Sequence, residues 1–370
     1  MLTVVYLAIS SVTGDRVSDD HLSHRACTVR APHWGHVPFF GMRFDFRNPA
    51  SAATTMTERY RAGIEMAEWA DRLGFVSLVL SEHHGSPDGY LPSPLVMAGA
   101  IAARTTRIRL MISAVVAPLH DPLRLAEDAA VVDLISGGRL DLTLANGYVA
   151  AEFAMFDVPM DQRPRRVRRA VETLQAAWTG EPFDHDGRPA TVTPAPERGS
   201  SNGGRAGPAI SLGGSTDGAA KRAARIADGF TPSMPEVWEP YRAERIALGH
   251  PDPGPYFGVA VGNFHLAADV EQGWSEVGQY FLHETNAYGR WMADAGLDGM
   301  YHLADDVDDV RAQGMYRVLT PDQLLAEMEA AGPWAFVLLH PLLGGIPPET
   351  GWRSLGLFEQ DVLPRCNASN

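Results

Sequence analysis

Short apolar runs alternate with helix-like stretches along this chain, from about residue 42 to near its end. The apolar runs have the length of buried strands, and glycine or proline often marks the joints. The centres of eight such runs are Phe44, Val79, Met111, Leu142, Ile210, Phe230, Val259 and Val337. Eight strand–helix repeats favour a (β/α)8 TIM barrel, an α/β fold, over a doubly wound sheet.

Individual segments support this pattern with start and stop signals. Residues 57–73 carry apolar side chains at helical spacing and end at Gly74, which is typical of a glycine C-cap. Asp121 followed by Pro122 predicts the N-cap and first residue of another helix. Residues 256–267 alternate apolar with small side chains, which predicts a seventh strand.

The chain divides into three parts. Residues 1–40 show no sustained periodicity and are predicted to be a loosely structured N-terminal extension. Residues 41–365 form the predicted barrel domain, and 366–370 a tail. Within the barrel, residues 181–207 are rich in Gly, Pro, Ser and Thr and predict an insertion. Composition alone fits a lid over a substrate or a disordered spacer equally well.

Charge and cysteine content limit the function classes. The formal net charge of −14 argues against general attraction to nucleic acid or to an acidic membrane surface. The two cysteines, Cys27 and Cys366, offer no disulfide framework, which favours a reducing cytoplasm. No apolar run approaches the roughly 20 residues of a membrane span. We therefore expect a cytoplasmic protein that acts on a small molecule.

Polar residues follow the predicted strands, and a barrel places its chemistry at the C-terminal ends of its strands. The candidates selected by this rule are Glu82, His83, His84, Ser113, Ala114, Asn146, Tyr148, Gly213, Gly214, Ser215, Thr216 and His340.

The Glu82-His83-His84 cluster allows several interpretations. A histidine here can satisfy a backbone carbonyl, or Glu82 can hold an imidazole in one tautomer. A metal site is a further possibility, but the first strand lacks the HxH pair of barrel hydrolases. The N-terminal histidines, at positions 21, 24, 33 and 36, also lack organised carboxylate or cysteine neighbours. We expect no metal site, and we interpret residues 121–128 as helix-start chemistry.

Residues Gly213-Gly214-Ser215-Thr216 also have two interpretations. Glycines before a helix expose backbone N–H groups, and the helix dipole favours an anion, so the turn can seat a phosphate. The same residues can simply form a tight turn with an N-cap. Their position after the fifth strand favours the phosphate seat.

Motifs spread along most of the chain closely resemble the luciferase-like flavin-dependent monooxygenases. They are Glu82-His83-His84, Thr105-Thr106-Arg107-Ile108, residues 118–128, Leu134-Ile135-Ser136-Gly137-Gly138-Arg139, Glu152-Phe153, Phe156, Ala177-Trp178-Thr179-Gly180, Gly213-Gly214-Ser215-Thr216, Ala223-Ala224-Arg225, Asp228-Gly229, Leu338-Leu339-His340-Pro341 and Val362-Leu363-Pro364. The resemblance spans about residues 42–365. It implies a (β/α)8 barrel, a reduced flavin or a deazaflavin at the strand ends, and frequent dimerisation.

The resemblance also implies roles for single residues. His83 matches the histidine that bacterial luciferase needs for activity. Ser113 and Ala114 fall where the family often has a cis peptide bond under the flavin ring, and Gly214, Ser215 and Thr216 fall at its phosphate seat. Together with Gly213, Asn146 and Tyr148, these residues are the expected cofactor-binding set, and His83 is the expected catalytic residue.

Two residues depart from the pattern. Asn146 stands where many flavin-using members have an arginine for the phosphate, and Ala145 replaces a reactive cysteine of luciferase. The resemblance still implies a monooxygenase in which reduced FMN, supplied by a separate reductase, and oxygen oxidise a small organic substrate through a flavin hydroperoxide. One alternative is a deazaflavin-dependent hydride-transfer oxidoreductase. Another is a non-catalytic flavin-binding partner subunit. A homodimer is expected.

Overall fold

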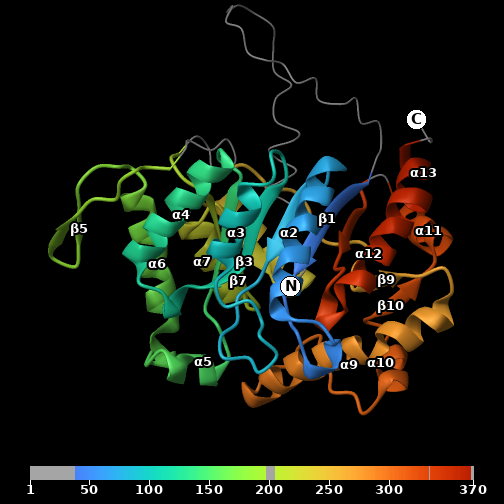
Figure 1. Ribbon diagram of the computed structural model, residues 1–370. Helices are drawn as coiled ribbons and strands as arrows, with labels where there is room; N and C mark the ends of the chain where they lie inside the picture. Colours follow the sequence, from blue (N-terminus) through green and yellow to red (C-terminus); the bar gives the residue numbers. More distant parts are fainter. Residues whose placement is uncertain (1–37, 197–204, 333, 368–370) are drawn as a thin grey trace, which may run out of the picture.

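The centre of the protein is a curled sheet of seven parallel strands, in the order β11, β1, β2, β3, β4, β7 and β8 (Figure 1). The computed structural model describes residues 38–196, 205–332 and 334–367. The strands are β1 (Phe39–Phe44), β2 (Ser77–Leu80), β3 (Arg109–Val116), β4 (Leu140–Ala145), β7 (Ala209–Gly214), β8 (Gly229–Pro232) and β11 (Phe336–Leu339). The order follows the chain, and the last strand pairs with the first in parallel, which confirms the predicted TIM-barrel architecture.

The segment at the seventh strand position pairs with the barrel sheet over a shorter length than the sequence predicts. Within residues 256–267, Val261 forms an isolated parallel bridge with Val337 of β11, and Ala260 donates its backbone N–H to Phe336. Residues Phe264–Leu266 form β9, which pairs with β10 (Arg317–Leu319) in a separate two-stranded sheet. Asn263 lies between the two segments with a φ of 52°, a left-handed conformation that interrupts a strand. Prediction of one continuous strand here was therefore wrong.

Helices surround the sheet (Figure 1). The α-helices are α2 (Met56–Arg72), α3 (Pro94–Ala102), α4 (Pro122–Ser136), α5 (Ala150–Met155), α6 (Arg163–Ala177), α7 (Asp217–Ile226), α8 (Trp238–Ala247), α9 (Val270–Asp294), α10 (Val307–Gln313), α11 (Pro321–Ala331), α12 (Pro348–Leu357) and α13 (Leu363–Asn367). The short turns are η1 (Ala50–Ala52), η2 (Ala117–Leu119), η3 (Met160–Gln162), η5 (Pro235–Val237), η6 (Leu343–Gly345) and the π-helical η7 (Phe358–Val362). The sequence did not predict α5 or α10, because helices of six and seven residues are too short to show a period.

The predicted helix signals act as expected. Asp121 caps α4 by accepting hydrogen bonds from the backbone N–H groups of Leu123 and Arg124, at 2.9 and 3.1 Å. Gly74 follows α2 with a φ of 82°, which a side chain would disfavour. These local signals fix where the helices begin and end, and thereby how the strand ends are presented.

The predicted insertion contains a hairpin of β5 (Phe183–His185) and β6 (Arg188–Ala190). Asp186, at its turn, forms an ion pair with Arg169 of α6. In Figure 1 the hairpin projects beside α6, away from α5 and α9. The described part of the insertion is therefore ordered and does not cover the strand ends, while residues 197–204 lie outside the described residues.

Three further expectations concern the ends of the chain and the membrane. Residues 1–37 of the predicted extension lie outside the described residues, and β1 begins at Phe39, before the predicted start of the strand. The predicted tail overlaps α13, which reaches Asn367. Within the described ranges, no helix combines the length and apolarity needed to cross a bilayer.

Candidate active site

His83 follows β2 and is paired with a carboxylate. Its Nδ1 lies 2.8 Å from Oε1 of Glu152, which belongs to the short helix α5. The same oxygen accepts the backbone N–H of His84 at 3.0 Å, so the carboxylate is fixed from two sides. A carboxylate can only accept, so in the neutral imidazole Nδ1 carries the proton and Nε2 has the free lone pair.

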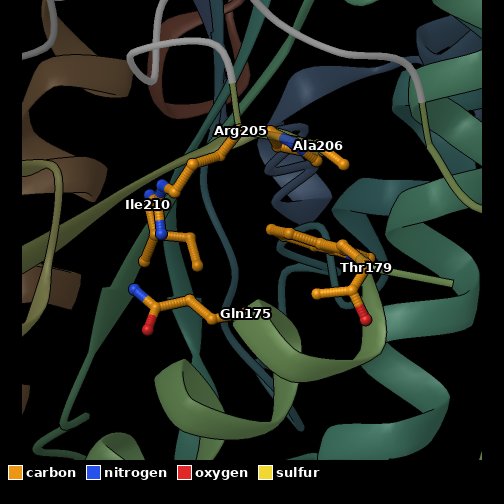
Figure 2. Close-up of a pocket in the computed structure, with 7 residues that line it drawn as sticks. Gln175, Thr179, Arg205, Ala206 and Ile210 are labelled. Carbon is orange, nitrogen blue, oxygen red and sulfur yellow. The ribbon is translucent and has the colours of Figure 1, made fainter. Parts of the chain in front are cut away.

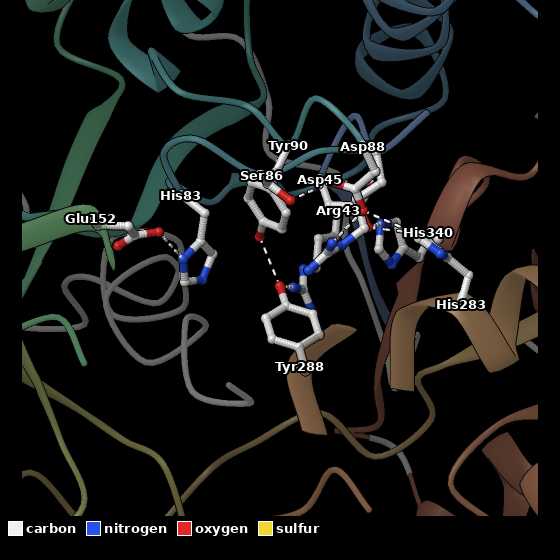
Figure 3. A network of polar contacts seen from close by, with 12 residues as sticks. Arg43, Asp45, His83, Ser86, Asp88, Tyr90, Glu152, His283, Tyr288 and His340 are labelled. Atoms are coloured by element: carbon white, nitrogen blue, oxygen red, sulfur yellow. Dashed lines mark hydrogen bonds and ion pairs between the residues drawn. The ribbon is translucent and has the colours of Figure 1, made fainter. Parts of the chain in front are cut away.

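Aromatic rings surround His83, and Figure 3 shows two of them, Tyr90 and Tyr288, on the side away from Glu152. The ring centroid of His83 lies 4.8 Å from Tyr90 and 4.4 Å from Trp291, and 5.9 Å from both Tyr148 and Tyr288. His83 is only 7% exposed. Burial lowers the pKa of His83 below its usual value, although the hydrogen bond that His83 donates to Glu152 opposes that effect. The surrounding rings keep the imidazole in an apolar environment. Glu152 binds only Nδ1, so Nε2 has no contact with this carboxylate.

Buried charges lie behind the aromatic rings. Arg43 Nη2 donates to the Tyr288 hydroxyl at 3.1 Å, and that hydroxyl is 2.8 Å from the Tyr90 hydroxyl (Figure 3). The Arg47 guanidinium lies 4.7 Å from the Tyr90 and Tyr288 rings and 4.9 Å from Trp291. Its Nη1 also donates to Asp88 at 2.5 Å. Cation–π contacts thus hold the rings that surround His83.

His340, another strand-end candidate, lies in this charged interior after β11. Its Nε2 is 3.8 Å from Asp45 Oδ2, and neither ring nitrogen has a hydrogen-bond partner within the described residues. Burial and then the charges of Arg43, Arg47 and Arg59 lower its pKa well below the usual value. His340 therefore lies apart from the His83–Glu152 pair and lacks its polar support.

Glu82 binds His84 and His120, and not His83, the catalytic candidate from the sequence. Its Oε1 accepts from Nε2 of His84 and of His120, each at 2.7 Å, and its Oε2 accepts the backbone N–H of Val116 at 2.8 Å. Burial raises the pKa of Glu82, but hydrogen bonds from His120 and His84 outweigh it and bring the pKa to about 2. The prediction that Glu82 fixes an imidazole is confirmed for His84, whereas Glu152 does so for His83.

Ser113 and Ala114 belong to β3, beside the end of β2. The peptide bond between them is cis. The Ser81 hydroxyl donates to the Ser113 carbonyl at 2.9 Å, which joins the two strands. Ser113 is buried and Ala114 half-buried. These two residues on β3 therefore lie beside the segment that follows β2 and carries His83.

The Gly213–Thr216 turn caps helix α7, and part of it is exposed to solvent. The Thr216 hydroxyl accepts the backbone N–H of Ala219 and caps α7, as the alternative interpretation predicted. A Cβ on Gly214 would lie 2.5 Å from the Cβ of Ala219, so this glycine permits helix–strand packing. A Cβ on Gly213 would meet only ordinary contacts, and Ser215 is exposed. Gly213 is therefore packed against β4, and the exposed Ser215 is accessible to a ligand.

Asn146 is half-buried after β4, and a cation distant in sequence contacts the residue next to it. Arg163, at the start of α6, donates from Nη1 to the carbonyl of Gly147 at 2.7 Å. Sequence reasoning missed this arginine because it is 17 positions from Asn146 and carries no local motif. The β4 end therefore has a positive charge despite the neutral amide.

Other missed residues come from the same limitation. Glu152 was part of a recognised motif but had no assigned partner, since α5 was not predicted. Trp291 belongs to an aromatic stripe of α9 that the sequence assigned to the core or a dimer interface. Trp274 and Phe281 are indeed buried, but Trp291 contacts His83. Only the three-dimensional placement of α9 separates these roles.

A hollow of about 260 Å³ lies at the opposite end of the barrel, where α6 ends and β7 begins (Figure 2). Its lining residues are Gln175, Trp178, Thr179, Arg205, Ala206, Pro208 and Ile210. Arg205 forms an ion pair with Asp228. Because barrels of this kind carry their chemistry at the C-terminal strand ends, this hollow is not part of the candidate active site.

The fold and site together define a parallel α/β barrel with a carboxylate-paired histidine at the C-terminal ends of its strands. The family model for luciferase-like monooxygenases matches residues 40–337. The chain belongs to the luciferase-like monooxygenase family.

Individual relatives show how far the similarity extends. The oxygenase component of the flavin-dependent trigonelline monooxygenase of Acinetobacter baylyi is 33% identical over 135 residues, 36% of this chain and 37% of that protein. The chain spans less than two-fifths of the length of the first curated relatives that it matches.

Two solved structures resemble the whole barrel. The monooxygenase RslO1 from Streptomyces bottropensis has a TM-score of 0.68 and 26% identity, with 88% of this chain and 99% of that chain covered. The oxygenating constituent of 3,6-diketocamphane monooxygenase of Pseudomonas putida, in complex with FMN, has a TM-score of 0.62 and 20% identity, with 89% and 98% covered. The second likeness shows the fold.

Proposed function

We propose that this protein is a flavin-dependent monooxygenase that uses reduced FMN and molecular oxygen to oxidise a small organic substrate. The single observation that carries the proposal is the buried His83–Glu152 pair within an aromatic enclosure at the barrel's C-terminal end. Membership of the luciferase-like monooxygenase family supports it. When bound, reduced FMN would supply the electrons that activate oxygen.

The protein's own residues would manage protons and water. Glu152 holds Nδ1 of His83, so Nε2 is the nitrogen that can accept a proton from the substrate side and return it. Tyr90, Tyr288 and Trp291 surround the imidazole and would keep bulk water from the reacting groups. His83 is thus the proposed catalytic residue, and Glu152 the residue that positions it.

The cofactor would lie across the strand ends from β3 to β7. We assign Ser113, Ala114 and Tyr148 to the flavin ring, and Asn146, Gly213, Gly214, Ser215 and Thr216 to the phosphate end. The exposed Ser215 supports the phosphate end, while the Thr216 hydroxyl is already engaged in capping α7. Arg163 joins the phosphate assignment, since its charge lies at the β4 end.

Asn146 favours one competing function, a deazaflavin-dependent hydride-transfer oxidoreductase. The neutral amide of Asn146 binds a phosphate more weakly than the charged arginine that many flavin-using members of the family have at this position. Anaerobic titration with reduced FMN and with the reduced deazaflavin distinguishes the two. We expect saturable binding of reduced FMN, followed by oxygenated product after addition of air and candidate substrates. Binding of the deazaflavin alone would contradict the FMN assignment.

Partners follow from this chemistry. Reduced FMN would come from a separate flavin reductase, and the substrate would be a small organic molecule. A homodimer remains our expectation, and exposed Val96, Val131 and Ile135 on α3 and α4 are compatible with it. Light scattering of the purified protein tests the dimer. The intact His83–Glu152 pair argues against a non-catalytic subunit.

A further inference from the structure

Three side chains beside the candidate active site point their ligand atoms at one position. Glu82 Oε1 lies 2.7 Å from Nε2 of both His84 and His120. All three atoms lie within 4.8 Å of one another. Two imidazole nitrogens and one carboxylate oxygen form a donor set typical of first-row divalent cations, whereas Mg²⁺ and Ca²⁺ prefer oxygen alone.

Neighbouring groups hold these ligands in place. The backbone N–H of Val116 binds the second oxygen of Glu82, so only Oε1 faces the two imidazoles. The Phe156 ring packs edge-on against His84, with centroids 4.7 Å apart. Such supporting contacts orient ligands before a metal arrives.

Burial leaves one side of the cluster accessible. The exposed side-chain fractions are 0% for Glu82, 9% for His84 and 29% for His120. A cation can therefore enter past His120 and keep a water molecule on that side. Three protein ligands with an open position are a common arrangement for zinc.

We propose that Glu82, His84 and His120 form a binding site for a first-row divalent cation such as Zn²⁺ or Co²⁺. The cation would replace the two N–H donors between the imidazoles and the carboxylate, with each Nε2 lone pair turned to the metal. Bonds of the usual length place tetrahedral ligand atoms about 3.3 Å apart, so Oε1 of Glu82 needs to move away from each imidazole Nε2 by only about half an ångström. The proposal departs from our expectation of no metal site, since the sequence places Glu82 and His84 together but His120 only after the next strand of the barrel.

The site has a structural consequence that goes beyond the proposed function. Glu82 and His84 flank His83 in the chain, and His120 follows the turn η2 after β3. A bound cation would join the segment after β2 to the segment after β3, and fix the backbone that carries His83. Flavin binding does not depend on it, so the two proposals can fail separately.

Titration of the full-length, chelator-treated protein with Co²⁺, followed by visible absorption, tests the site. We expect one equivalent to give the bands of tetrahedral or five-coordinate cobalt, with competition by Zn²⁺ in calorimetry. His120→Ala should weaken binding by more than about 100-fold, beyond the loss typical of supporting residues. His120→Cys should restore binding and add a sulfur-to-cobalt band in the near ultraviolet, which a purely hydrogen-bonding role does not predict.

His283→Ala is the matched control. His283 has the same 29% exposed side chain and the same 2.7 Å contact with a carboxylate, that of Asp88, but no second imidazole contacts that carboxylate among the described residues. Its removal should leave cobalt binding intact. The proposal is overturned if wild-type protein gives no cobalt bands, if His120→Ala keeps them, or if His283→Ala loses them equally. Far-ultraviolet dichroism of each metal-free variant verifies folding.

Discussion

Two buried histidines follow strands on either side of β1, and their surroundings differ. His83 follows β2 and is 7% exposed, while His340 follows β11 and is 4% exposed. Glu152 binds Nδ1 of His83, whereas both ring nitrogens of His340 lack a hydrogen-bond partner among the described residues. Burial at a strand end is therefore shared, and a carboxylate that fixes the tautomer is what distinguishes the residue suited to proton transfer.

The charges around the two histidines also differ. His340 faces Arg43, Arg47 and Arg59, and Asp45 at 3.8 Å is its nearest counter-charge. A further positive charge on the imidazole would be unfavourable there, so His340 stays neutral. We infer that His340 serves the packing of the charged interior, and the following substitutions test this difference.

Replacement of His83 by alanine should have the largest effect. His83→Ala removes the nitrogen proposed to move protons, so product formation should fall by about 10²- to 10⁴-fold at saturating reduced FMN. Product is measured by mass spectrometry under single-turnover conditions. The exposed His250 provides the control, since His250→Ala should retain activity. Unchanged product formation in His83→Ala would refute the proposed role.

Replacement of Glu152 by glutamine should have a smaller effect on the same step. A glutamine amide can donate to Nδ1, which favours the tautomer with the proton on Nε2. A hydrogen bond to a charged group contributes about 1.5–3 kcal/mol, so kcat should fall by about 10- to 100-fold. KM should change little, because Glu152 is not proposed to touch the substrate. A rise in KM at constant kcat would instead place Glu152 in substrate binding.

The contrast between the two histidines was only half visible in the sequence. Strand periodicity placed both after strands, and Gly74 and Asp121 marked helix ends correctly because caps act through neighbouring residues. Glu152 binds a residue 69 positions away, and Trp291 reaches His83 from α9. Such partners depend on how helices pack, which local propensity does not encode. The prediction of a continuous seventh strand failed for a local reason. Asn263 has a left-handed backbone conformation, which an alternating pattern of side chains does not reveal.

Replacement of His340 by leucine should affect stability against pH more than chemistry. Burial and the nearby arginines lower the pKa of His340 in the folded state, so below about pH 6.5 the unfolded chain binds a proton that the folded protein does not. Wild-type stability should therefore fall with acidification by up to about 1.4 kcal/mol per pH unit from this residue, while the variant lacks that loss. Urea unfolding of both proteins at pH 7 and pH 5.5 measures it. As the pH falls, the free energy of unfolding of the variant should rise relative to that of the wild type. The variant should still form product. A loss of product as large as that of His83→Ala would mean that both histidines serve the chemistry, and the distinction drawn from Glu152 would be wrong.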